Sequence, residues 1–201
     1  MGITPREFEQ LQNRVSGLRR KPEELRVSAP QASVEHRVVL GLDPSLRGTG
    51  YGIIRWQKPR PLVLAQGTIK IPAGWSRSRC LLQISQILRQ VVQEHRPTVC
   101  AVEGLFYAQN LQTALIMGEA RGASLVVVAE AGMEVCEIAP RKVKQAVVGY
   151  GAAAKTAVAR MVQRMLALEE LPSPDAADAL ALALTFAQQS NRYNLSPARR
   201  L

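Results

Sequence analysis

The chain has few aromatic residues and few cysteines among its 201 residues, and these shortages limit the kind of core and of metal site that it can form. Aromatic side chains make up 4% of the sequence, against 47% for all hydrophobic residues, so the core must be aliphatic and rich in alanine. The three cysteines are far apart and form neither a Cys-x-x-Cys pair nor a zinc-binding spacing. This pattern excludes a cysteine-based zinc site and indicates a reduced, intracellular protein.

Long uncharged hydrophobic runs are also missing. No apolar stretch is free of charge over the length that a bilayer requires, and the N-terminus lacks the apolar centre of a signal peptide. Five acidic side chains among residues 1–37 disfavour a transit peptide. We therefore expect a cytoplasmic protein without a membrane partner.

Positive charge is abundant, with a formal net charge of +10 at pH 7. Such a surplus in a small protein favours a polyanionic partner, with nucleic acid as the first candidate. A basic surface that only keeps the protein soluble would give the same count. Charge alone leaves both interpretations open.

Hydrophobic periodicity predicts an α/β fold. We expect strands over residues 37–43, 49–56, 62–71, 98–103 and 134–138. We expect helices over residues 76–94, 110–131, 140–148, 155–168 and 174–189. A three-strand meander followed by alternating helices and strands predicts a five-stranded mixed sheet with helices on both faces.

Composition divides the chain into three parts. Residues 37–190 should form the folded domain. Residues 1–36 are an N-terminal extension, either a short helix beginning near Pro5 or a disordered arm, for which a tail without specific function is the plainer interpretation. Residues 191–201 are polar and basic and should form a loose tail.

Four acidic residues occur in apolar or small-residue surroundings. Asp43 and Glu103 each end a predicted buried strand, whereas Asp175 and Asp178 begin the last predicted helix. Carboxylates are rarely buried unless they are paired or bind a metal. If the two strands are parallel neighbours, Asp43 and Glu103 lie side by side at the edge where α/β sheets bind ligands. For Asp175 and Asp178, favourable interaction with the helix dipole is a competing interpretation.

Oxygen ligands without histidine or cysteine suit hard cations such as Mg²⁺ or Mn²⁺. Two such ions, roughly 3.5–4 Å apart, could hold the attacking water and the leaving oxygen of a phosphodiester. The four acids therefore predict a site that binds two metal ions and acts on a polyanionic substrate.

Basic and aromatic residues near these acids could bind nucleic acid. The basic side chains cluster at two helix starts: Arg141, Lys142, Lys144 and Lys155. They could contact phosphates, or they could form an ordinary solvated helix face. Phe106, just beyond Glu103, could stack on an unpaired base or pack in the core. Glycines at 48, 50 and 52 would let a hairpin twist or another backbone approach closely.

Five stretches in order resemble the RuvC family of Holliday-junction resolvases across residues 37–190. They are residues 40–52, 102–106 with Asn110, 118–122, 140–149 with Lys155, and 175–181. Each stretch alone is weak, but the ordered set is specific. The family usually begins near the first strand, so residues 1–36 are an addition.

The resemblance implies a ribonuclease-H-like fold and an endonuclease that nicks opposing strands of a four-way DNA junction. Asp43, Glu103, Asp175 and Asp178 match the family's metal ligands, and Phe106 matches an aromatic that stacks near the crossover. Lys144 and Lys155 match basic residues near the scissile phosphate. The resemblance further implies Mg²⁺, 5′-phosphate products, a homodimer built partly on helix 110–131, and the RuvA–RuvB branch-migration complex as a partner.

Two other functions compete with this hypothesis. A sugar-kinase-like phosphotransferase of the ribonuclease-H-like group also places an Asp near glycines, but this chain is short for two lobes and leaves Asp175 and Asp178 without a role. A junction-binding protein that has lost catalysis would explain the charge but not four retained acids. A structural or interaction protein likewise leaves the acids unexplained.

Overall fold

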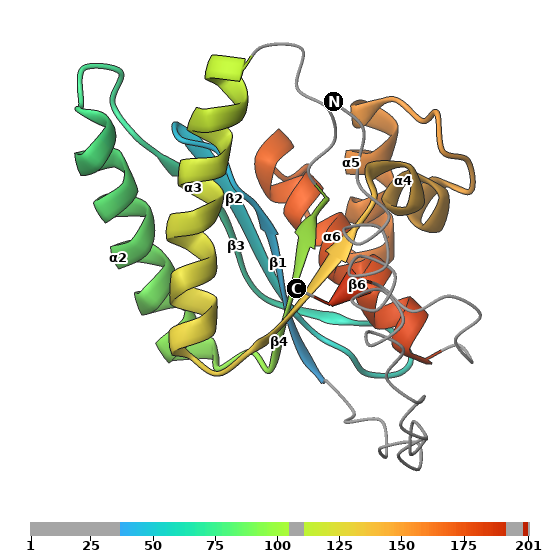
Figure 1. The fold of residues 1–201 in the computed structure, drawn as a ribbon. Helices are drawn as coiled ribbons and strands as arrows, with labels where there is room; N and C mark the ends of the chain where they lie inside the picture. The colour runs from blue at the N-terminus through green and yellow to red at the C-terminus, as the bar shows by residue number, and fades with distance from the viewer. Residues whose placement is uncertain (1–36, 105–110, 192–198, 201) are drawn as a thin grey trace, which may run out of the picture. The chain divides into compact units, whose positions relative to one another are not determined.

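The computed structural model describes residues 37–104, 111–191 and 199–200, which form one mixed sheet with helices on both faces (Figure 1). The strands are β1 (Val38–Asp43), β2 (Gly48–Arg55), β3 (Leu62–Lys70), β4 (Val99–Glu103), β5 (Glu134–Ile138) and β6 (Arg199–Arg200). Their order across the sheet is β3-β2-β1-β4-β5-β6. The α/β prediction is therefore confirmed, including its five-stranded mixed core.

Strand β1 lies at the centre and joins two kinds of pairing. It pairs antiparallel with β2, which pairs antiparallel with β3, and it pairs parallel with β4 on its other side. Strand β4 continues the parallel part into β5. The carboxyl ends of β1, β4 and β5 consequently meet at one edge of the sheet.

Five helices in the described part of the chain cover the two faces. They are α2 (Arg77–His95), α3 (Leu111–Glu130), α4 (Pro140–Val148), α5 (Lys155–Leu166) and α6 (Pro174–Asn191). Helices α2 and α3 pack on one face, and α4, α5 and α6 pack on the other (Figure 1). Each face has its own cluster of buried aliphatic side chains, as the shortage of aromatics required.

Helix α6 is the most buried of the described helices, and glycines let it approach the sheet. A Cβ added at Gly41 would lie 1.8 Å from the Ala179 carbonyl oxygen, and one at Gly50 would lie 2.1 Å from the Asp175 carbonyl oxygen. Since real Cβ atoms do not approach that closely, the helix backbone rests on the strands where only glycine fits. The glycines expected to admit another backbone therefore admit α6.

Helix α3 has two different faces. Its sheet side buries Ala120, Arg121, Ser124, Val127 and Val128. On the other side, Leu111 is 75% exposed, Leu115 is 58% exposed and Val126 is 53% exposed. By length and composition alone this helix is apolar enough to cross a membrane, but it carries Glu119, Arg121 and Glu130 and so is not an uncharged stretch. An exposed apolar side on a helix that also packs against a sheet equally fits a protein partner.

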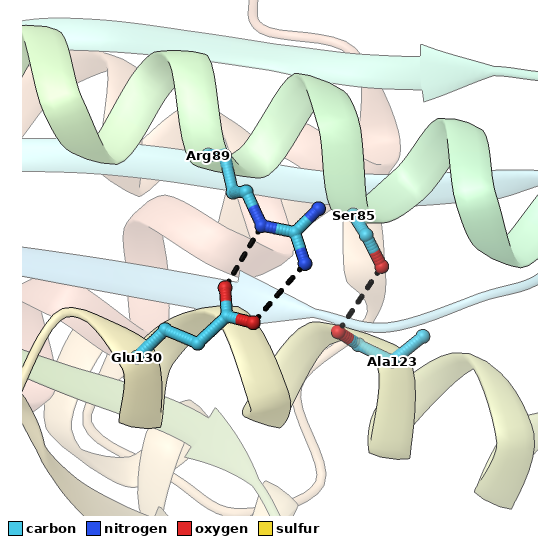
Figure 2. A network of polar contacts seen from close by, with 4 residues as sticks. All are labelled: Ser85, Arg89, Ala123 and Glu130. Carbon is cyan, nitrogen blue, oxygen red and sulfur yellow. Dashed lines mark hydrogen bonds and ion pairs between the residues drawn. The ribbon is translucent and has the colours of Figure 1, made fainter.

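Polar contacts join α3 to α2 along their outer seam. The Arg89 guanidinium donates to both carboxylate oxygens of Glu130, at 2.8 and 3.2 Å, and the Ser85 hydroxyl donates to the Ala123 carbonyl oxygen at 3.4 Å (Figure 2). Both charged partners are about half exposed, so this pair contributes little net stability. It lies along the seam where the two helices pack against each other.

The structure differs from the sequence prediction at two ends. Helix α5 ends at Leu166 rather than 168, because Ala167 adopts left-handed backbone angles and Leu168 donates back to the Gln163 carbonyl. The tail predicted to be loose contributes Arg199–Arg200 as β6, antiparallel to β5. The predicted extension, residues 1–36, lies outside the described residues, so the division into three parts remains a prediction.

Candidate active site

Strand alternation places Asp43 and Glu103 on the same face of the sheet. Val39 and Val99 pack in the cluster beneath α6, and side chains two residues apart share a face. Asp43 and Glu103 therefore point to the α6 side at the ends of their strands. The parallel register pairs Leu42 with Val102, so the two acids occupy adjacent positions.

The first two turns of α6 bring the other two acids to this edge. Pro174 begins the helix, with Asp175 in its first turn and Asp178 one turn later. The Asp175 carboxylate lies against Gly48, where an added Cβ would be 3.1 Å from Oδ2. Because the helix backbone contacts β1 and β2 directly, its acidic end is positioned by main-chain packing.

The four acids form one electrostatic group centred on Asp43. The pKa of Asp43 is raised from 3.8 to about 7, first by burial and then by the negative charges of Glu103, Asp178 and Asp175. Burial, followed by Asp178, also raises the pKa of Glu103. These shifts show that negative charge accumulates here without full compensation from the protein.

Lys155 is the cation in closest contact with this group. Its Nζ donates to Asp178 Oδ2 at 2.8 Å, and this bond raises the pKa of Lys155, with Asp43 and Glu103 contributing less. Lys155 also lowers the pKa of Asp43. Since the lysine side chain is 76% exposed, it can leave Asp178 for another anion at small cost.

The residues present fit a divalent cation by their chemistry. The donor set consists of carboxylate oxygens, which Mg²⁺ and Mn²⁺ prefer, and Asp43 experiences repulsion from three other carboxylates that a cation would relieve. Among the described residues, no three His, Cys, Asp or Glu side chains already form a ready-made metal-binding group. The fit therefore rests on charge and donor type.

The structure brings some of the predicted DNA-binding residues to the acids. Lys144 on α4 lies close enough to lower the pKa of Glu103, as Lys155 does. Arg141 is exposed and lies over the Gly151 backbone, where an added Cβ would be 2.4 Å from its Cγ. Phe106 lies outside the described residues.

Arg121 lies in the stretch 118–122 that resembles the family, but its sequence position indicated no role for it. Its Nη1 donates to the main-chain carbonyl oxygen of Glu103, and its Nη2 lies 3.3 Å from Glu137 Oε1. Arg121 is only 7% exposed, although arginine is rarely buried without partners. An arginine on the buried side of a helix would have indicated a structural role. The sequence alone does not show which side of α3 faces the sheet.

Comparison with known proteins places the chain among junction-cutting enzymes. The family described as crossover junction endodeoxyribonuclease RuvC matches residues 39–186. RuvC of Akkermansia muciniphila is 46% identical over 147 residues, covering 73% of this chain and 88% of the relative. RuvC of Heliobacterium modesticaldum is 48% identical over 151 residues, covering 75% and 93%.

Solved structures agree with this assignment. Thermus thermophilus RuvC in complex with a Holliday junction substrate superposes with a TM-score of 0.73 at 34% identity, covering 83% of this chain and 100% of that one. The yeast mitochondrial Holliday junction resolvase Ydc2, with a TM-score of 0.52 at 13% identity, shows the shared fold alone. The chain belongs to the RuvC family of crossover junction endodeoxyribonucleases.

Proposed function

We propose that this chain resolves Holliday junctions by nicking two opposing DNA strands, with Asp43, Glu103, Asp175 and Asp178 as its catalytic acids. The observation that carries the proposal is the mutual electrostatic influence of these four carboxylates at one sheet edge, in a chain of the RuvC family. Residues from β1, β4 and α6 converge there although they are separated by as many as 135 positions in the sequence.

A nuclease of this family is of the metal-dependent type, and the four acids would hold the metal. Mg²⁺, or Mn²⁺ in its place, is the ion that an all-carboxylate set selects, and two ions per site is the proposed number. When bound, the metal supplies Lewis-acid polarisation of the phosphate and a water of lowered pKa. The four carboxylates would hold the ion at the sheet edge, where Asp43 is largely withdrawn from solvent.

Lys155 and Lys144 complete the proposed site. Lys155 reaches Asp178 now, and its exposed ammonium can turn to a phosphate oxygen and stabilise charge that develops during cleavage. Lys144 and Arg141 on α4 would contact neighbouring phosphates, and Phe106 would stack on a base near the crossover. Cleavage would leave 5′-phosphate and 3′-hydroxyl ends.

Two-fold symmetry in the substrate calls for two active sites, so we propose a homodimer that uses the exposed side of α3. Leu111, Leu115 and Val126 form an apolar stripe opposite the side that packs on the sheet. Gly118 and Gly122 lie on the same stripe, with open space where a Cβ would be, so a second helix could approach closely. A branch-migration complex of the RuvA–RuvB type is the proposed partner assembly, in the cytoplasm with the nucleoid.

The decisive experiment incubates the protein with a synthetic four-way junction and with a linear duplex of the same sequence, with and without Mg²⁺. We expect paired, symmetric nicks in the junction only, and only with metal. Junction binding should weaken steeply as salt rises, because phosphate contacts release counterions. Binding without cutting at any metal concentration would instead support the non-catalytic junction binder.

A further inference from the structure

The face of the sheet opposite α6 holds a buried ion pair that contacts the main chain of an active-site residue. Arg121 lies in the sheet-facing side of α3, and its partner Glu137 lies in β5. Side-chain exposure is 8% for the arginine and 17% for the glutamate. A guanidinium removed from water to this degree requires its partners, so its direction is fixed.

The same guanidinium binds the backbone of a proposed catalytic residue. Arg121 donates to the carbonyl oxygen of Glu103, the last residue of β4. Parallel pairing of β1 with β4 ends one residue earlier, at Leu42 and Val102, and on the other side Gly104 donates to the Ile138 carbonyl at 2.9 Å. Glu103 therefore lies where the sheet stops supporting β4 from the β1 side.

Glu103 takes part on both sides of the sheet. Its carboxylate lies on the α6 face, where it and the carboxylates of Asp43 and Asp178 repel one another, while its carbonyl accepts from Arg121 on the α3 face. The positive charge of Arg121 also lies near enough to lower the pKa of Glu103. A fixed main chain at this position fixes where the carboxylate can reach.

We propose that Arg121 is a positioning residue that holds Glu103 in place for divalent metal, acting from α3 through the main chain and anchored by Glu137. This inference rests on the proposed function, because it takes Glu103 to be a metal ligand. Arg121 would then connect α3, the helix proposed for dimer contact, to the acids on the opposite face of the sheet. Groups that orient a metal ligand typically change metal affinity by about 10- to 100-fold when they are lost.

The test compares three variants with the wild-type protein. Arg121→Lys keeps the charge but loses the planar fork that serves two acceptors at once. Arg121→Met with Glu137→Leu replaces the buried pair by apolar side chains of similar size, which preserves folding in cases where a single replacement leaves a buried charge. Arg89→Met with Glu130→Leu is the matched control, since this ion pair also involves α3 but lies on the exposed seam with α2 (Figure 2).

Mn²⁺ binding to each folded protein is measured by electron paramagnetic resonance, without DNA. We expect about 10-fold or greater weakening in both Arg121 variants and no change in the Arg89 control. In junction cutting, the Mg²⁺ concentration for half-maximal rate should rise, and saturating Mg²⁺ should restore much of the rate. Metal-free junction binding should stay at the wild-type level.

The possible outcomes separate two failures. If the Arg121 variants lose thermal stability but bind Mn²⁺ as tightly as wild type, Arg121 only anchors α3 and the inference is overturned. If wild type itself binds Mn²⁺ but does not cut junctions, the proposed function fails while the metal readout still decides the role of Arg121. If Arg121→Lys does not fold, the double variant provides the same comparison.

Discussion

The two faces of the sheet are built in different ways. On the α6 face, a buried helix rests its backbone on glycines of β1 and β2, and its first turns carry acids to the sheet edge. On the α3 face, two helices pack through side chains, join by an exposed ion pair and leave an apolar stripe uncovered. The difference teaches that the α6 face positions its acids by packing helix main chain directly on the strands, whereas the α3 face acts through side chains and keeps an exposed apolar side.

Replacing the acids on the α6 face should have the largest effect, and the effect should be on cutting rather than on DNA binding. We expect Asp43→Asn or Glu103→Gln to reduce junction cutting by roughly 10³-fold or more, because a ligand of the metal is lost, while binding, which depends on basic residues, persists. Cutting is measured on a labelled four-way junction and binding by gel shift. Glu169→Gln, an exposed acid away from the site, is the control. Near-normal nicking by either site variant would remove these acids from the mechanism.

Adding one methyl group to each face should have opposite effects on stability. Gly41→Ala places a Cβ 1.8 Å from the Ala179 carbonyl oxygen, so α6 must move and unfolding should become easier by about 3 kcal/mol. Gly122→Ala meets nothing within 4 Å on the outer side of α3, and the gain in helix propensity should stabilise the domain by about 0.5–1 kcal/mol.

Urea unfolding measures both changes. The Gly122 variant is compared on a Leu115→Asp background, so that dimer contacts do not contribute to its stability. Equal effects of the two alanines would show that α6 is not packed as closely as the glycines indicate.

Breaking the apolar stripe should affect assembly and leave the site intact. We expect Leu115→Asp to raise the dimer dissociation constant by roughly 30-fold, about 2 kcal/mol, because an exposed anchor of the proposed interface becomes charged. Analytical ultracentrifugation measures the shift. Leu82→Asp on α2 is the matched control, since Leu82 is 55% exposed against 58% for Leu115. A dimer that tolerates the α3 change but not the α2 change would move the interface to α2.

A further expected effect concerns the pH dependence of stability. The pKa of Asp43 is raised to about 7 in the folded protein, so between pH 4 and 7 the folded state retains a proton that the unfolded state has lost. Stability of the metal-free protein should therefore fall as pH rises through this window. Asp43→Asn removes the effect and should be more stable than wild type at pH 8, on the order of 1–2 kcal/mol, with no advantage at pH 4.

Urea melts without metal, from pH 4 to 8, measure this dependence. Added Mg²⁺ should recover more stability at pH 8 than at pH 5, because the cation compensates the ionised carboxylates. A wild-type curve that is flat across the window would mean that Asp43 is far more solvated than its surroundings indicate.

The sequence predicted the α6 face better than the α3 face, for physical reasons. Asp43 and Glu103 end apolar strands and were expected side by side if those strands are parallel neighbours, and β1 and β4 do pair in parallel. The glycines of β2 signalled close approach, although only the structure identifies α6 as the element that approaches. Lys155 was expected near phosphate, and its present bond to Asp178 depends on how α5 packs against α6.

Other features depend on contacts between distant parts of the chain. The role of Arg121 requires knowing that α3 turns this residue to the sheet beside β4 and β5. Strand β6 has two residues, and its pairing with β5 is a tertiary contact that local propensity does not encode. The end of α5 is set by the backbone angles of Ala167, a residue with high helix propensity, so composition extended the helix too far.

The glycine contact between α6 and the central strands also bears on heat inactivation. A carboxylate on a hinged loop can lose its alignment many degrees below the melting point, because the loop loosens first. Here Asp175 and Asp178 cannot move away from Asp43 unless α6 separates from the sheet. That separation would expose the apolar side chains that α6 buries. Loss of alignment and loss of the fold should therefore be one thermal event, with nicking capacity retained almost to the temperature at which the domain melts.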